Sequence, residues 1–155
     1  MSETSPPKLR VFVDADVLFA GAASPGEHGA SLLILRLGEL TLVEALTSEQ
    51  VVTEAEQNLE AKMPQALPLF RLLVSRALTV VPKPTASELA THAGLADTKD
   101  LPILVAALQA GCPWLVTFNV RHYHPGHPDV AITRPGELVR RVREMLAHLR
   151  GDEEV

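Results

Sequence analysis

The chain has 155 residues, 46% of them hydrophobic, which suits one globular domain with its own core. No stretch approaches the roughly 20 apolar residues of a membrane span, so we expect no membrane association. The net charge of −5 argues against a protein that binds nucleic acid through phosphate contacts alone. A bound divalent metal would, however, reverse the sign of the local electric field.

Three parts of the chain are expected. Residues 1–8 lack the basic and apolar regions of a signal peptide, and we expect a short disordered lead there. Residues 9–150 would form a single domain, and the acidic residues 151–155 a frayed tail. Cys112 is the only cysteine, which excludes an internal disulfide and fits a reducing cytoplasm.

Hydrophobic periodicity and turn residues predict strands that alternate with helices. The predicted strands are 9–13, 78–81, 114–118 and 130–133. The predicted helices are 31–40, 49–63, 67–77, 85–93, 100–110 and 135–150. Segment 41–46 is ambiguous between a strand and the end of the preceding helix. The alternation favours a three-layer α/β/α fold with a mainly parallel central sheet.

Polar side chains stand where predicted strands end or helices begin. Asp14 follows the first strand, Asp100 opens a helix, and Thr117 and Asn119 lie at the end of strand 114–118. The carboxyl ends of parallel strands share one edge of a sheet, so these side chains can converge. A cluster of oxygens suits Mg²⁺ or Mn²⁺. Asn119 could instead stabilise a turn, and Thr117 could be a half-buried strand residue.

The aspartates also have a purely structural interpretation. Asp14 or Asp16 could cap a turn that begins near Val17. Asp100 is favoured at a helix start by capping and by the helix dipole, and Asp97 could take either role.

The predicted helix 49–63 carries two candidate glutamates. Ser48 is a good N-cap for it, and Pro64 would end it. The apolar stripe of this helix leaves Glu54 on one flank and Glu56 on the other, and periodicity does not choose between them.

Three histidines, His122, His124 and His127, follow strand 114–118. A structural zinc site would need a fourth ligand and a closed geometry. The prolines and the glycine between these histidines favour an exposed, irregular loop instead.

Together the motifs resemble the PIN-domain family. The shared order is strand-Asp, helix-Glu, helix-start Asp and strand-Thr-x-Asn, over about residues 10–138. The resemblance rests on VFVDADVLF at 11–19, Ser48 six residues before Glu54, DLPILVAAL at 100–108, VTFNVRHY at 116–123 and VAITRPGEL at 130–138.

The resemblance implies a metal-dependent ribonuclease, often the toxin of a VapC-type toxin–antitoxin pair. It implies that Asp14 and Asp100 bind Mg²⁺ or Mn²⁺ and that Glu54 is a ligand or orients water. Asn119 and Thr117 would position water or metal. RNA is the implied substrate, and a homodimer and a cognate antitoxin are the implied partners. The leucine-rich helices predicted around residues 32–40 and 67–78 also favour a homodimer, because they carry more apolar side chains than one sheet face covers.

Two positions depart from the family's pattern. Asp16 stands where the family more often has Asn or Ser, and Asn119 stands where many members have a fourth Asp. The missing charge at Asn119 could weaken a second metal site, and Asp16 could partly restore that charge. A PIN-like binding module with weak catalysis is therefore an alternative function.

A haloacid-dehalogenase-like phosphatase is the nearest enzyme alternative. The sequence DADV at 14–17 follows a strand, as that chemistry requires, and Thr117 could serve as its second motif. The same chemistry needs a later Lys and an acidic pair. No Lys follows Thr117, and the acids between it and the tail are Asp129, Glu137 and Glu144.

Overall fold

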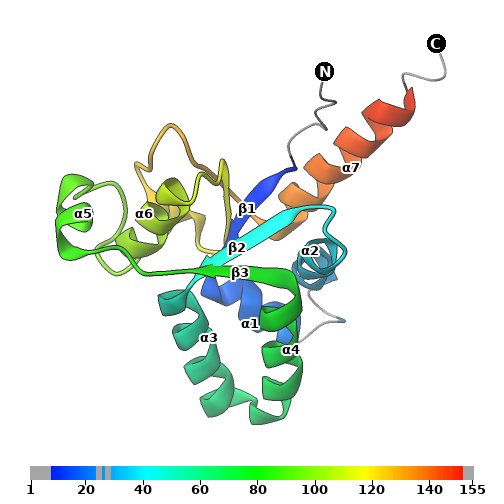
Figure 1. The fold of residues 1–155 in the computed structure, drawn as a ribbon, viewed down its shortest axis with the longest axis horizontal. Helices are drawn as coiled ribbons and strands as arrows, with labels where there is room; N and C mark the ends of the chain where they lie inside the picture. Colours follow the sequence, from blue (N-terminus) through cyan, green and yellow to red (C-terminus); the bar gives the residue numbers. More distant parts are fainter. Residues whose placement is uncertain (1–7, 24–25, 27–28, 152–155) are drawn as a thin grey trace, which may run out of the picture.

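The computed structural model describes residues 8–23, 26 and 29–151, so nearly all of the expected lead and tail lies outside the described residues. A parallel sheet forms its centre, with the strand order β3-β2-β1-β4-β5 (Figure 1). The strands are β1 (Arg10–Val13), β2 (Glu44–Ser48), β3 (Leu78–Val81), β4 (Trp114–Val116) and β5 (Ala131–Thr133).

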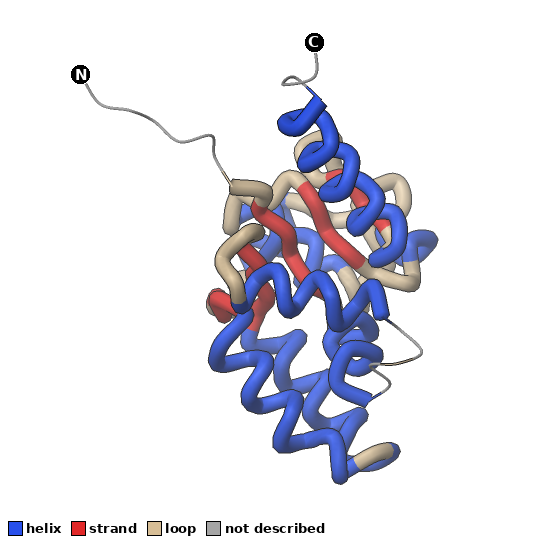
Figure 2. The backbone as a smooth tube through the Cα atoms, turned by 90° about the vertical axis from the view of Figure 1, so that its right-hand side faces the viewer, coloured by secondary structure: helices blue, strands red, loops and turns tan. Residues whose placement is uncertain are grey.

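Helices cover both faces of the sheet, which confirms the three-layer α/β/α prediction. The helices are α1 (Ala15–Ala23), α2 (Gly29–Glu39), α3 (Glu49–Lys62), α4 (Leu67–Ala77), α5 (Ala86–Thr91), α6 (Leu101–Gln109) and α7 (Pro135–Gly151). Helices α1 to α4 pack against one another, and α5 packs on α6. In Figure 1, α1, α3 and α4 lie below the strands, α2 lies to their right, and α5 and α6 lie to their left. Helix α7 packs on α2 and continues past the strands (Figure 2).

Most helix boundaries lie where capping residues predict them. Ser48 Oγ accepts a hydrogen bond from Val51 N (3.3 Å) and is the predicted N-cap of α3. Thr85 and Glu88 form a capping box at the start of α5. Gly111 follows α6 with a φ of 70°, a left-handed conformation that glycine adopts without strain. Among the described residues, none of the helices combines the length and apolar composition that a membrane span requires.

Two segments form regular elements that the sequence alone does not assign. The ambiguous segment 41–46 contributes to β2, which pairs with β1 so that Leu46 lies opposite Phe12. Residues 15–23, for which the sequence predicts only a turn near Val17, form the helix α1. Most of α1 is buried, so its sequence ADVLFAGAA has no polar face and no amphipathic period to reveal a helix.

The register of the sheet brings the ends of β1 and β4 together. Val13 lies opposite Val116, and beyond this pair Asp14 N donates to Val116 O (3.1 Å). Asp14 and Thr117 therefore follow their strands side by side at the carboxyl edge. From β2, Thr47 Oγ1 donates to the carbonyl of Val13 (2.8 Å), so three strands meet at this point.

Candidate functional site

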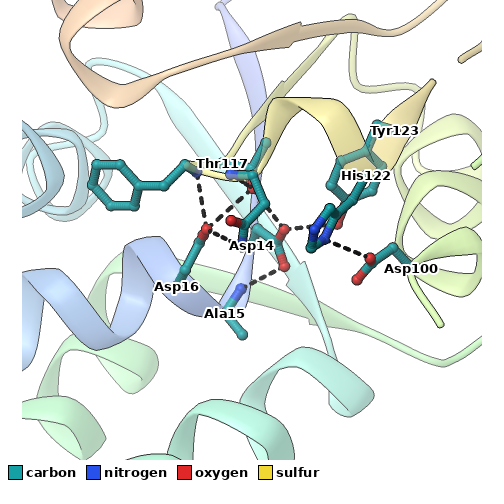
Figure 3. A network of polar contacts seen from close by, with 9 residues as sticks. Asp14, Ala15, Asp16, Asp100, Thr117, His122 and Tyr123 are labelled. Atoms are coloured by element: carbon teal, nitrogen blue, oxygen red, sulfur yellow. Dashed lines mark hydrogen bonds and ion pairs between the residues drawn. The ribbon is translucent and has the colours of Figure 1, made fainter. Parts of the chain in front are cut away.

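The carboxylate of Asp14 lies at the centre of a polar network at the carboxyl edge of the sheet (Figure 3). Asp14 is buried, with 5% of its surface exposed. Its Oδ1 accepts a hydrogen bond from Ala15 N (2.7 Å), and its Oδ2 accepts from Thr117 Oγ1 (2.9 Å) and Tyr123 Oη (2.6 Å). These three donors fix the orientation of the carboxylate.

Asp16 lies beside Asp14, in the first turn of α1. Its Oδ2 accepts from Phe118 N (2.9 Å) and Asn119 Nδ2 (3.1 Å), and it lies 3.3 Å from Thr117 Oγ1. Its Oδ1 is buried and has no hydrogen-bond partner among the described residues. Burial and the nearby charge of Asp14 raise the pKa of Asp16 from 3.8 to about 6.

Helix α3 directs Glu54 toward these carboxylates and Glu56 away from them. Glu54 lines the pocket that contains Asp14 and Asp100. Burial raises the pKa of Glu54, and the charges of those two aspartates raise it further. Glu56 Oε2 instead lies 3.3 Å from Arg71 Nε on α4. The structure thus distinguishes the two glutamates that periodicity leaves equivalent.

Asp100 precedes α6, but its side chain makes no capping hydrogen bond. Its Oδ2 lies 3.1 Å from His122 Nδ1 instead, in the short 3₁₀ helix Val120–Tyr123. Ligand atoms of Asp97, Asp100 and His122 all lie within 4.8 Å of one another, a grouping that could hold a metal ion. Burial and the charge of Asp14 raise the pKa of Asp100, whereas His122 lowers it.

The acidic side chains open onto one pocket of about 340 Å³. Two lysines, Lys62 and Lys99, line the same pocket, as do the amides of Asn58 and Asn119 and the ring of Phe19. Carboxylates close to one another repel, and a divalent cation would relieve that repulsion. Cations and amides beside the carboxylates would suit an anionic substrate.

The structure brings the five predicted site residues to one place. The four residues Asp14, Glu54, Asp100 and Asn119 line the pocket, and the fully buried Thr117 contacts it through Asp14. The interpretation of Asp100 as a side-chain cap is wrong, because its carboxylate contacts His122.

The three histidines that follow β4 have separate surroundings, since His122 contacts Asp100 and His127 contacts Asp129. Within the described part of the chain, the group of potential metal ligands near them contains His122 but neither His124 nor His127. His127 Nδ1 accepts a hydrogen bond from Asp129 N (3.0 Å).

Sequence reasoning missed Tyr123, Lys99 and the contact between His122 and Asp100. Tyr123 comes four residues after Asn119 and is the only tyrosine of the chain, yet it lies 109 residues from the aspartate it contacts. A lone aromatic residue near a strand end is a weak signal, because such residues usually fill the core.

A family model for the PIN domain matches residues 10–121. A search of curated proteins found no match to this sequence.

Solved structures share the fold at low sequence identity. PAE2754 from Pyrobaculum aerophilum has a TM-score of 0.60 and 22% identity, over 85% of this chain and 88% of that chain. VapBC2 from Rickettsia felis, bound to a DNA fragment from its promoter, has a TM-score of 0.56 and 17% identity, over 80% and 97%. VapC20 from Mycobacterium tuberculosis, a toxin that cleaves the sarcin–ricin loop, has a TM-score of 0.50 and 18% identity, over 68% and 86%.

Proposed function

The chain belongs to the PIN-domain family, and from that premise we propose that it is a divalent-metal-dependent ribonuclease that hydrolyses RNA phosphodiesters at the acidic pocket. One observation carries the proposal: Asp14, Asp16, Glu54 and Asp100 line one pocket, although they come from three separate segments of the chain. Several of these carboxyls have raised pKa values, as groups at functional sites often do.

The donor set fits Mg²⁺ or Mn²⁺. Asp16 Oδ1, which is buried and lacks a hydrogen-bond partner among the described residues, is an oxygen that a cation would satisfy. Asp14, Asp16, Glu54, Asp100 and Asn119 would hold the ion or ions. When bound, such an ion lowers the pKa of a ligated water and neutralises charge on the phosphate.

Hydrogen bonds orient two of the proposed ligands. The hydroxyls of Thr117 and Tyr123 hold Asp14 Oδ2, so this carboxylate keeps one orientation before any substrate arrives. His122 holds Asp100 in the same way, through a contact of 3.1 Å. Preorganised groups of this kind need no rearrangement during the reaction.

Other pocket residues would act on water and on the substrate. Glu54 has a raised pKa, which favours a role in orienting the attacking water and accepting its proton. Lys62 and Lys99 would attract the phosphodiester to a chain whose net charge is −5. Asn119 would position water or metal.

The setting we propose is that of a toxin in a toxin–antitoxin pair. The similarity in fold to VapBC2 and to the toxin VapC20 supports this setting, as does the family. We place the protein in the cytoplasm, where a free and buried thiol such as Cys112 stays reduced.

A homodimer and a cognate antitoxin belong to the same proposal. Leu33 on α2 and Leu72 on α4 are each 40% exposed, and these two helices pack together. Such apolar surface supports a protein partner. Multi-angle light scattering over a hundredfold dilution series tests the dimer, and a monomer at every concentration would reject it.

A catalytically weak binding module is the second candidate. It is favoured by Asn119, whose amide donates to Asp16 Oδ2 (3.1 Å) where many family members have a further carboxylate. Family membership removes the case for a haloacid-dehalogenase-like phosphatase.

An RNA cleavage assay separates the two candidates. We expect single-stranded RNA to be cut in Mg²⁺ or Mn²⁺, to survive in EDTA, and to survive with the Asp100→Asn variant. Asp129→Asn, on an exposed loop, is the matched control and should cut normally. RNA binding without cleavage in either metal would reject the ribonuclease and support the binding module.

A further inference from the structure

One part of the acidic pocket is lined by an amide, a lysine and an aromatic ring instead of carboxylates. Helix α3 presents Glu54, Asn58 and Lys62 to the pocket, and these residues are spaced one helical turn apart. Across from them, Phe19 of α1 lines the same pocket. Along one face of α3 the lining therefore changes from carboxylate to amide and then to a cation beside an aromatic ring.

Lys62 and Phe19 contact each other directly. The Nζ of Lys62 lies 5.9 Å from the centre of the Phe19 ring, within the range of a cation–π contact. Lys62 and Asn58 are exposed, and Phe19 is half-buried and packs against the core. One part of the ring is therefore held in place by the core while the rest faces the pocket.

This pair has no evident role in holding a cation. A phenyl ring offers no ligand atom, and an ammonium group repels a metal ion. Lys62 also lies eight residues beyond Glu54, which places their backbones about 12 Å apart along the helix. That separation suits a neighbouring part of a long substrate.

We propose that Phe19, Asn58 and Lys62 form a subsite for one unstacked base of single-stranded RNA and its phosphate, next to the acidic cluster. This inference rests on the proposed ribonuclease function. The base stacks on the Phe19 ring, as single-stranded bases do on aromatic side chains. The flexible Lys62 side chain leaves the ring and binds a phosphate, and the Asn58 amide hydrogen-bonds the edge of the base.

The charges in the pocket favour RNA over a neutral ligand here. Lys62 supplies positive charge, and Asn58 can donate and accept hydrogen bonds, which is what a base edge requires. An aromatic platform beside a cation is the usual pairing in proteins that bind single strands.

An abasic scan tests the subsite. The RNA is a fluorescent single strand in which one abasic residue is moved from position to position, and affinity is measured by fluorescence anisotropy. Every protein carries Asp100→Asn so that the RNA stays intact, and cleavage by the unaltered chain is measured in parallel. With Phe19 present, we expect one abasic position to weaken binding by about tenfold. In Phe19→Leu the abasic position should no longer weaken binding, because the ring on which the base stacks is already gone. In Phe19→Tyr, which keeps an aromatic ring, the abasic position should still weaken binding. Removal of the base and removal of the ring should therefore be coupled.

A second measurement isolates Lys62. Lys62→Gln should weaken binding and reduce the slope of log affinity against log salt by about 0.7, the value for one phosphate contact to a single strand. Lys8→Gln, on an exposed residue before β1, is the matched control and should leave the slope unchanged. This arm decides the matter if Phe19→Leu does not fold.

The outcomes separate the subsite from the ribonuclease function. If the unaltered chain cleaves RNA but the abasic profile is flat, or is the same in Phe19→Leu, the subsite is rejected and the ribonuclease stands. An unchanged salt slope in Lys62→Gln would also reject the subsite. If the unaltered chain neither binds nor cleaves RNA, both proposals fail.

Discussion

The hydroxyl of Tyr123 donates a 2.6 Å hydrogen bond to Asp14 Oδ2, so a residue that follows β4 fixes the carboxylate that follows β1. Both residues are buried, and Thr117 donates to the same oxygen. Asp14 is therefore poorly suited to an Asp→Asn test, because an amide would place a donor against these donors. Asp100, which makes no such set of contacts, is the cleaner position to neutralise.

The contact between Tyr123 and Asp14 leads to the first prediction. Tyr123→Phe removes the hydroxyl and keeps the buried ring, so the core should stay packed. If Tyr123 orients Asp14, Mn²⁺ affinity measured by calorimetry should fall by about 10- to 100-fold, as for other groups that orient metal ligands. Equal Mn²⁺ affinity in the two proteins would show that the hydroxyl has only a structural role.

The raised pKa of Asp16 predicts how the metal-free protein responds to pH. The native carboxyl keeps its proton up to about pH 6, whereas the unfolded chain loses it near 3.8. The native state therefore binds more protons in that interval, and the free energy of unfolding should fall as the pH rises through it. The shift corresponds to at most roughly 3 kcal/mol.

Urea unfolding in EDTA at several pH values measures this dependence. Asp16→Asn should reduce the decrease in the free energy of unfolding with rising pH. Part of the decrease should remain, because Glu54 and Asp100 contribute in the same direction. Glu60→Gln, on the exposed side of α3, should leave the pH dependence as it is. A free energy of unfolding that rises between pH 4 and 6 would contradict the predicted direction of the pH dependence.

The two glutamates of α3 form a matched pair for a test of activity. Glu54→Gln should lower kcat for RNA cleavage by about 10²- to 10⁴-fold, the usual contribution of a general base. Glu56→Gln should change kcat by less than about twofold, because its partner Arg71 lies on α4 and an exposed ion pair contributes little. The reverse ranking would mean that Glu56 is the functional residue.

Much of the fold could be predicted from the sequence because its strands are short apolar runs between capped helices. Ser48 and Pro64 bound α3, and Gly111 follows α6. Helix α1 could not be predicted, since the pattern that marks a helix is a polar face and α1 is buried nearly all round. Segment 41–46 could not be assigned either, because its place in β2 depends on pairing with β1.

The site could be predicted in outline because Asp14 follows a strand and Asp100 precedes a helix. The choice between Glu54 and Glu56 depends on which flank of α3 faces the pocket, and periodicity holds no such information. The contact of Tyr123 with Asp14 also depends on the path of the chain after β4. Contacts between distant segments are properties of the folded chain, so single-sequence patterns do not reveal them.

Asn119 gives a prediction with two opposite effects. Asn119→Asp replaces the donor to Asp16 Oδ2 with a second carboxylate. The metal-free protein should lose about 0.5–1.5 kcal/mol of stability, because an exposed hydrogen bond is lost and a repulsion is gained. Mn²⁺ binding should become tighter and should need a higher pH for full occupancy, since another proton must leave. Unaltered Mn²⁺ affinity would place Asn119 outside the metal site.

The central claim is that the acidic pocket binds a divalent cation, and the melting temperature of the protein in Mn²⁺ tests it most directly. At about 100 times its dissociation constant, Mn²⁺ should stabilise the native state by roughly 2.7 kcal/mol. Asp100→Asn should remove most of that gain, and Glu56→Gln should keep it. An unchanged melting temperature in millimolar Mn²⁺ and in millimolar Mg²⁺ would contradict the claim.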